Sequence, residues 1–141
     1  PTRAYFGEKD FQQLAIIREM VRKYPFNLEI VGCPIVRESD GLALSSRNAR
    51  LSAEQRVQAL QISKTLFASC EYAKTHSLAE TKLYVEECIA KAEGLRLDSS
   101  DKVDGTTLQT VTDWNDSTYI VGCITVFCGE VRLIDNIKYK E

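Results

Sequence analysis

Phe6-Gly-Glu-Lys-Asp10 contains residue types that can bind a phosphate, and it lies where a short apolar run gives way to a helical pattern. Gly7 lets a ligand approach the backbone, and the free N–H groups at a helix start favour an anion. Lys9 can place a positive charge beside a phosphate. Gln13 lies one helical turn further on, so its amide can face the same crevice. This segment therefore suggests half of a nucleotide site.

The same residues also have a simpler interpretation. Asp10 or Glu8 can cap the helix while Lys9 points into solvent, because short acidic side chains are common at helix starts. Local chemistry alone leaves both interpretations open.

A second segment with suitable chemistry is Leu44-Ser-Ser-Arg47, which follows the turn signal Asp40-Gly41. Two hydroxyls and a guanidinium suit a triphosphate, because serines donate hydrogen bonds and arginine adds bidentate charge-assisted ones. A loop of this kind can also close over a nucleotide and complete the site. Serines near a helix start are ordinary, however, so composition alone also leaves this segment undecided.

The first segment lies within a predicted βαβ unit. Ala4–Phe6 predicts the end of a strand, apolar spacings of three and four predict a helix from about Glu8 to Lys23, and Leu28–Val31 predicts a second strand. Such strands normally pair in parallel, and open α/β sheets bind ligands at the carboxyl ends of their strands. Two parallel strands leave an open edge, so we expect the chain to begin within a larger sheet.

The rest of the chain predicts a small α+β domain. Residues 35–51 predict a linking loop, and capping-box patterns at Ser52–Gln55 and Ser77–Glu80 open two helices, ending near Lys74 and Gly94. Further elements are strands at Tyr119–Phe127 and Val131–Asp135, joined as a hairpin, and a weaker strand within Leu95–Ser99 or near Thr107–Val111.

Charge and hydropathy exclude several classes of function. Eighteen basic and twenty acidic residues give a net charge of −2 with no basic block, so nucleic acid is not expected as a partner. No apolar run reaches the roughly 18 residues of a membrane span, and the first residues lack the pattern of a signal peptide. We therefore expect no membrane association and a cytoplasmic location.

Cysteine and histidine usage argues against a metal site within the chain. The five cysteines contain no C-x-x-C pair, so they are expected to be buried small hydrophobic residues in a reducing compartment, without disulfides or zinc. The single histidine, His76, lies between two predicted helices without a nucleophile near it in sequence, which favours a surface turn residue over a catalytic one.

Taken together, several blocks resemble the pantothenate synthetases, also called pantoate-β-alanine ligases. The resemblance is carried, in order and at the family's spacing, by Phe6-Gly-Glu-Lys-Asp-Phe-Gln-Gln13, Val31-Gly-Cys-Pro-Ile-Val-Arg37, Asp40-Gly-Leu-Ala-Leu-Ser-Ser-Arg-Asn48 and Arg132-Leu-Ile-Asp-Asn-Ile137. It covers the whole chain and is strongest over residues 4–56. Long blocks in register are far more specific than one short motif.

The resemblance implies both a fold and a reaction. Residues 1–35 would be the C-terminal end of a Rossmann-like nucleotidyltransferase domain, and residues 36–141 a C-terminal lid domain of two helices and a short antiparallel sheet. The family uses ATP and Mg²⁺ to convert pantoate into pantoyl adenylate, releasing pyrophosphate, and β-alanine then displaces AMP to give pantothenate. Full-length members are commonly homodimers.

The resemblance also implies roles for individual residues. Gln13 would hold pantoate, while Lys9, Ser45, Ser46 and Arg47 would be catalytic, stabilising negative charge on the reacting phosphates. No protein ligand for a metal is implied. The residues expected to contact ATP are Gly7, Glu8, Lys9, Asp10, Val36, Leu44, Ser45, Ser46 and Arg47.

One departure from the family pattern matters for activity. The family's H-I-G-H-like motif corresponds to a position upstream of Pro1, so the chain resembles a C-terminal portion that we expect to be inactive alone. Two alternatives stay open: another adenylate-forming nucleotidyltransferase, or a noncatalytic lid or interaction module whose sheet edge pairs with another chain.

Overall fold

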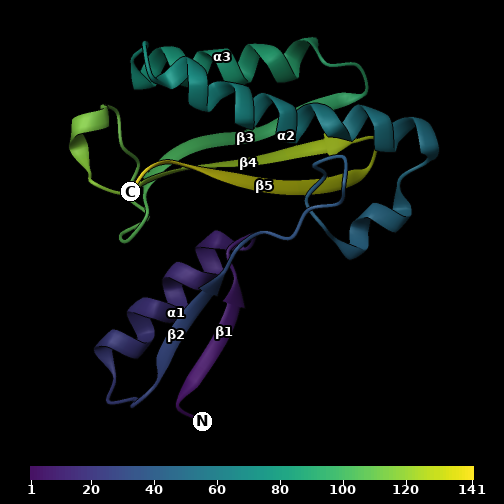
Figure 1. The fold of residues 1–141 in the computed structure, drawn as a ribbon. Coiled ribbons are helices and arrows are strands. Elements are labelled where there is room, and N and C mark those ends of the chain that lie inside the picture. The colour runs from purple at the N-terminus through teal and green to yellow at the C-terminus, as the bar shows by residue number, and fades with distance from the viewer.

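The computed structural model describes all 141 residues, and they form two parts joined by a linker (Figure 1). No helix is both long and apolar enough to cross a membrane. The elements, in chain order, are β1 (Arg3–Gly7), α1 (Phe11–Lys23), β2 (Glu29–Cys33), the 3-10 helix η1 (Ser46–Arg50), α2 (Ala53–Ala73), α3 (Leu78–Lys91), β3 (Leu95–Asp104), the 3-10 helix η2 (Trp114–Asp116), β4 (Ile120–Cys128) and β5 (Val131–Lys140).

The N-terminal part is the predicted βαβ unit. β1 and β2 pair in parallel, from Arg3 opposite Glu29 to Gly7 opposite Cys33. Helix α1 begins at Phe11 rather than at the expected Glu8. The reason is that the Glu8 N–H donates to the Cys33 carbonyl at 2.8 Å, which continues the strand pairing by one residue and delays the helix.

The C-terminal part is an antiparallel sheet in the order β3-β4-β5, covered on one face by α2 and α3 (Figure 1). Its main core lies between these layers and includes Leu66 and Ile89 from the helices and Val126 and Leu133 from the sheet. The predicted hairpin is confirmed: β4 and β5 are joined at Gly129, whose φ of 59° favours glycine.

Both predicted capping boxes are present. The Ser52 and Ser77 hydroxyls each accept a hydrogen bond from the backbone N–H three residues on, and the side-chain oxygens of Gln55 and Glu80 accept one from the backbone N–H of the same serine. The weaker strand predicted at Leu95–Ser99 is confirmed and extends to Asp104.

Thr107–Val111, the alternative position for that weaker strand, does not form a strand. It contributes only an isolated bridge between Val103 and Thr110. The chain turns here because the Asp104 carboxylate accepts hydrogen bonds from the backbone N–H groups of both Thr106 and Thr107, at 2.8 Å each.

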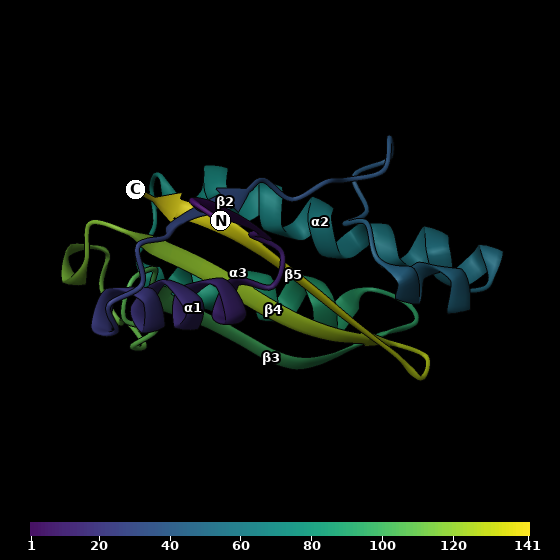
Figure 2. The same ribbon diagram turned by 90° about the horizontal axis from the view of Figure 1, so that it is seen from below.

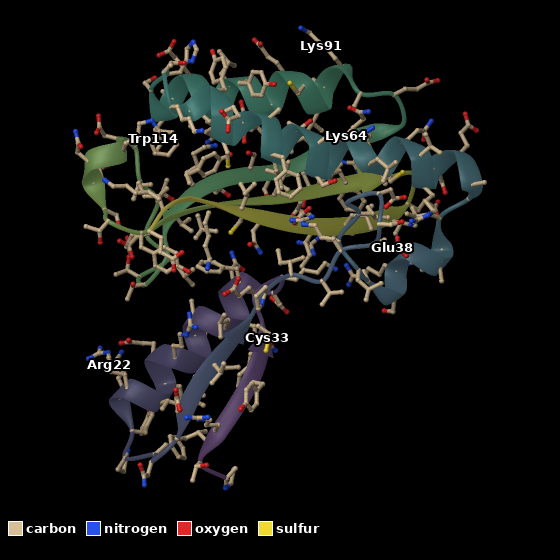
Figure 3. The ribbon with its side chains drawn as sticks, viewed as in Figure 1. Arg22, Cys33, Glu38, Lys64, Lys91 and Trp114 are labelled. Carbon is tan, nitrogen blue, oxygen red and sulfur yellow. The ribbon has the colours of Figure 1, made fainter.

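The cysteine prediction is partly wrong. All five are free, but only Cys128 is fully buried, and the other four are half-buried. Cys33 illustrates the reason, because it ends β2 where the chain leaves the parallel sheet for the linker (Figure 3).

The linker from 34 to 51 is more ordered than an open loop. The chain folds back at Gly41, whose φ is 97°, so that Arg37 and Ala43 form an isolated antiparallel β-bridge. Leu42 and Ala43 are buried. These contacts fix the position of the chain just before η1.

The start of α1 rests on the face of the antiparallel sheet that α2 and α3 leave open (Figure 2). Phe11 is buried against Val103 and Val121, and its ring meets the edge of Tyr119 at 6.1 Å between centroids. This contact brings the loop between β1 and α1 next to β5.

Candidate functional site

A cavity of about 430 Å³ lies where the two phosphate-binding candidates converge. Residues from both sequence segments line it, although one segment belongs to the βαβ unit and the other to the linker. Strand β5 completes the wall. The lining residues are Gly7, Lys9, Asp10, Gln13, Ser45, Arg47, Arg132 and Ile134.

The βαβ unit contributes the end of β1 and the first turn of α1. A side chain at Gly7 would meet no atom within 4 Å, so this position is open to a ligand. Asp10 occupies the N-cap position, but its side chain makes no capping hydrogen bond. The first backbone N–H groups of α1, at residues 11–13, have no protein acceptor. The helix start therefore keeps donors available for an anion.

Lys9 projects from this loop without an ion pair. Burial lowers its pKa from the ordinary lysine value, and the Arg47 guanidinium acts in the same direction. The carboxylates of Asp135 and Asp10 act in the opposite direction. Lys9 therefore lies in a mixed electrostatic environment, half-buried and with its ammonium available to a ligand.

The linker contributes Ser45 and Arg47. Ser45 caps η1 by accepting a hydrogen bond from the Arg47 N–H at 3.1 Å. The Arg47 guanidinium donates to the Arg132 carbonyl at 3.0 Å, which ties the loop to β5. The Ser45 hydroxyl proton and the remaining Arg47 N–H groups stay available as donors.

Arg132 is a cavity residue that we did not select from the sequence. Its exposed side chain adds a third cation beside Lys9 and Arg47. A signal was present, because Arg132 and Ile134 alternate along a predicted strand and must point to one face. We noted the surrounding block only for its family resemblance.

Four expected ATP-contacting residues do not line this cavity. Glu8 forms an ion pair with Lys138 at 3.4 Å. Ser46 is the first residue of η1. Val36 and Leu44 are joined by a backbone hydrogen bond of 2.9 Å, and both side chains are more than half exposed. The structure brings together the phosphate-binding candidates but does not test the roles expected of these four.

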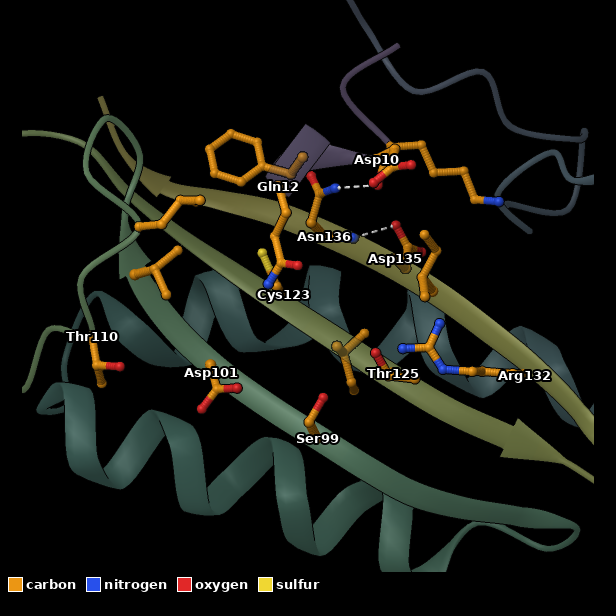
Figure 4. Close-up of a pocket in the computed structure, with 16 residues that line it drawn as sticks. Asp10, Gln12, Ser99, Asp101, Thr110, Cys123, Thr125, Arg132, Asp135 and Asn136 are labelled. Carbon is orange, nitrogen blue, oxygen red and sulfur yellow. Dashed lines mark hydrogen bonds between the residues drawn. The ribbon is translucent and has the colours of Figure 1, made fainter. Parts of the chain in front are cut away.

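A second cavity of about 410 Å³ lies on the open face of the sheet (Figure 4). It shares four lining residues with the first: Lys9, Asp10, Arg132 and Ile134. Its far wall is polar and comes mainly from β3 and β4. The labelled residues there are Ser99, Asp101, Thr110, Cys123 and Thr125. Each cavity falls within the range of roughly 300–1,000 Å³ that is typical of small-molecule sites.

Neither a metal centre nor histidine chemistry is built into this region. No group of three or more His, Cys, Asp or Glu side chains is placed to hold a metal ion. His76 lies in the turn between α2 and α3, stacked on Tyr72 with ring centroids 3.6 Å apart. The chemistry of the cavity rests on cations, hydroxyls and backbone donors.

Comparison with known proteins points to one family. The model of the pantoate-beta-alanine ligase family matches residues 1–138. The pantothenate synthetase of Phocaeicola vulgatus is 74% identical over 141 residues, covering 99% of this chain and 50% of that protein. The pantothenate synthetase of Bacteroides fragilis is 71% identical, covering 100% of this chain and 50% of that protein. The chain therefore spans about half the length of these relatives.

Solved structures give the same result. The pantothenate synthetase of Thermus thermophilus superposes with a TM-score of 0.91 at 43% identity, covering 100% of this chain and 51% of that one. The pantoate-beta-alanine ligase of Francisella tularensis, solved with Beta-gamma ATP and Beta-alanine, gives a TM-score of 0.61 at 27% identity, covering 99% of this chain and 44% of that one.

Proposed function

Because this chain belongs to the pantoate-β-alanine ligase family, we propose that it forms one side of the ATP site of such an enzyme. The intact enzyme, meaning a protein of the relatives' length that carries this chain, would condense pantoate with β-alanine through pantoyl adenylate. The observation that carries the proposal is the convergence of Lys9, Ser45 and Arg47 on one cavity.

The proposal includes a division of labour between the two parts. Residues 1–35 would end a Rossmann-like nucleotide-binding domain, and residues 36–141 would form its lid. Exposed apolar side chains on the βαβ unit support this assignment, because Tyr5 on the two-stranded sheet is 63% exposed and Ile16 on α1 is 61% exposed. Further sheet and helix packed there would bury them.

In the first half-reaction, a carboxylate oxygen of pantoate attacks the α-phosphorus of ATP. The new P–O bond forms as the bond to the pyrophosphate oxygen breaks, and pyrophosphate leaves. Lys9, Arg47 and the two serine hydroxyls would stabilise the negative charge that builds on the phosphates. The N–H groups at the start of α1, which have no protein acceptor, would add further donors.

Magnesium would enter as the ATP complex. The chain groups no set of acidic or histidine side chains that could hold a metal ion by itself. This agrees with the preference of Mg²⁺ for substrate phosphates and water over all-protein cages. Bound to the phosphates, the ion would neutralise part of their charge, leaving Lys9 and Arg47 to orient the triphosphate.

In the second half-reaction, the neutral amine of β-alanine attacks the acyl carbon of the adenylate. The C–N bond forms, the bond to the phosphate oxygen breaks, and AMP leaves while the amine loses a proton. Holding the two reactants together can supply much of the rate. The Francisella relative's complex with Beta-gamma ATP and Beta-alanine supports both as substrates of this enzyme.

Smaller roles complete the proposal. Gln13 lines the cavity one turn into α1, where its amide would hold pantoate. Val36 would touch the adenine region, Leu44 and Ser46 would belong to the phosphate-binding loop with Ser45 and Arg47, and Glu8 would be a further ATP contact. A cytoplasmic homodimer is expected for the intact enzyme.

The decisive experiment is ATP–pyrophosphate exchange by the intact enzyme with different acids. We expect exchange with pantoate and none with amino acids or nicotinate mononucleotide. Exchange supported by one of those compounds instead would favour another nucleotidyltransferase, and no exchange with any acid would favour a noncatalytic module. The 141-residue chain alone is expected to show no pantoate-dependent exchange.

A further inference from the structure

Asn136 on β5 contacts the proposed phosphate-binding loop from the opposite part of the molecule. Its side-chain amide donates to two consecutive backbone carbonyls, those of Glu8 at 2.9 Å and Lys9 at 3.0 Å. Figure 4 shows Asn136 beneath the loop with the bond to Lys9 dashed. The side chain is almost fully buried, with 7% of its surface exposed. One amide therefore fixes two successive peptide units.

The loop has few other restraints at this point. The Glu8 N–H is bonded to Cys33, the Glu8 carboxylate is paired with Lys138, and the Asp10 carbonyl accepts from Leu14 in the first turn of α1. The carbonyls of Glu8 and Lys9 face Asn136, and Asp10 does not cap the helix with its side chain. The path of the backbone through Lys9 therefore depends on the Asn136 amide.

Asn136 is itself held in a fixed orientation. Its backbone N–H donates to the Asp135 carboxylate at 2.8 Å, and β5 pairs Asn136 with Cys123 of β4. Asp135 in turn accepts two hydrogen bonds from Arg37, at 2.7 and 2.8 Å. A rigid strand and a doubly bonded carboxylate thus present the amide to the loop.

We propose that Asn136 is a positioning residue that aims Lys9 into the ATP cavity. This inference rests on the proposed function of that cavity. Lys9 has no ion pair to orient it, so the direction of its side chain is set by its backbone. Asn136 acts through the backbone of Glu8 and Lys9.

The first test is a double-mutant cycle in the intact enzyme. Asn136→Leu keeps the size of the side chain and removes both donors. We expect it to lower pantoate-dependent exchange by roughly tenfold to a hundredfold, the scale of an ångström-sized misplacement. In a Lys9→Ala background the same change should cost less than about twofold, because the residue it positions is gone.

Equal losses in both backgrounds would show that Asn136 acts independently of Lys9 and would overturn the proposal. Asn136→Ala serves as the second variant if the leucine is not accommodated. The control is Trp114→Phe, which removes one side-chain N–H bond to a backbone carbonyl, that of His76 in the turn between α2 and α3. It should leave exchange unchanged.

The second test does not depend on activity. Amide hydrogen exchange of the 141-residue chain should become several-fold faster in Asn136→Leu at Glu8 and Leu14, whose N–H groups are hydrogen-bonded on either side of the loop, with little change in α2 and α3. Unchanged exchange at both residues would contradict the positioning role. Failure of the unmodified enzyme to show pantoate-dependent exchange would contradict the proposed function, while this measurement would still decide the role of Asn136.

Discussion

At the scale of single residues, Lys102 is the most unusual member of the core. It is 2% exposed on β3, facing α2 and α3, and it has no ion pair. Its ammonium lies 5.0 Å from the centre of the Tyr139 ring. Burial, reinforced by the nearby Lys82, lowers the Lys102 pKa to about 8, although Glu86 and Asp101 oppose the shift. The charged form is therefore costly in the folded state.

This cost predicts a pH-dependent effect of Lys102→Met. The folded-state pKa of about 8 lies below the unfolded value of 10.5, so the unfolded chain binds more protons between these limits. Stability should rise with pH in that window. At pH 7 the variant should be more stable, by at most about 3 kcal/mol because it also loses the contact with Tyr139. The advantage should shrink from pH 8 upward.

Urea unfolding of both proteins at several pH values measures this difference. The two proteins must be compared at each pH because two other groups also lower stability at the alkaline end. Their pKa values are raised in the folded state, to about 11 for Cys123 and about 12 for Tyr139. Lys91→Met on the exposed face of α3 is the control and should show no such trend. A difference that does not change with pH would contradict the account of Lys102.

Sequence could not reveal these environments. Lys102 reads as an ordinary strand lysine, and the role of Asn136 depends on a loop 127 residues away in the chain. Lys9 and Arg47 could be selected because their residue types fit phosphate chemistry. Even for them, local chemistry left a helix cap and a solvated loop open, and the family resemblance favoured the site.

At the scale of elements, local signals were sufficient where the chain supplies its own partners. The capping boxes at Ser52 and Ser77 mark the starts of α2 and α3 because the hydrogen bonds are made within four residues. The start of α1 was wrong by three residues because the bond that delays it comes from Cys33 on β2. Such a contact has no signature in the local pattern.

The link between the linker and β5 gives an element-scale prediction. Arg37 and Asp135 form a bidentate pair in which Asp135 is 3% and Arg37 18% exposed. The guanidinium also lies 5.0 Å from the Phe67 ring centre on α2. Asp135→Asn leaves a largely buried cation without its partner, so it should lower the free energy of unfolding by about 3 kcal/mol.

Urea unfolding of Asp135→Asn and of two further variants tests this prediction. Arg37→Met/Asp135→Asn should recover part of the loss, because the unpaired charge is removed. Glu71→Gln makes the same chemical change in an exposed pair with Lys74 and should cost less than about 0.5 kcal/mol. If Asp135→Asn is as mild as Glu71→Gln, the pair does not hold the linker against β5.

At the scale of the whole molecule, the site depends on contacts between the two parts. Phe11 on the open face of the sheet and Asn136 under the loop bring β5 against the βαβ unit. The sequence predicted both parts but not how they meet, because periodicity carries no information on which face receives a distant loop. Alternation along β5 places Arg132 and Ile134 on one face but does not show that this face meets the Lys9 loop.

The measurement that tests the central claim most directly is pantoate-dependent ATP–pyrophosphate exchange by the intact enzyme carrying Lys9→Ala. We expect a loss of roughly a hundredfold to a thousandfold, the scale of removing one preorganised charge from a reacting phosphate. The urea midpoint should not change, because Lys9 has no ion pair to lose. Lys23→Ala, at the exposed end of α1, should keep normal exchange. Near-normal exchange by Lys9→Ala would contradict the assignment of this cavity to ATP.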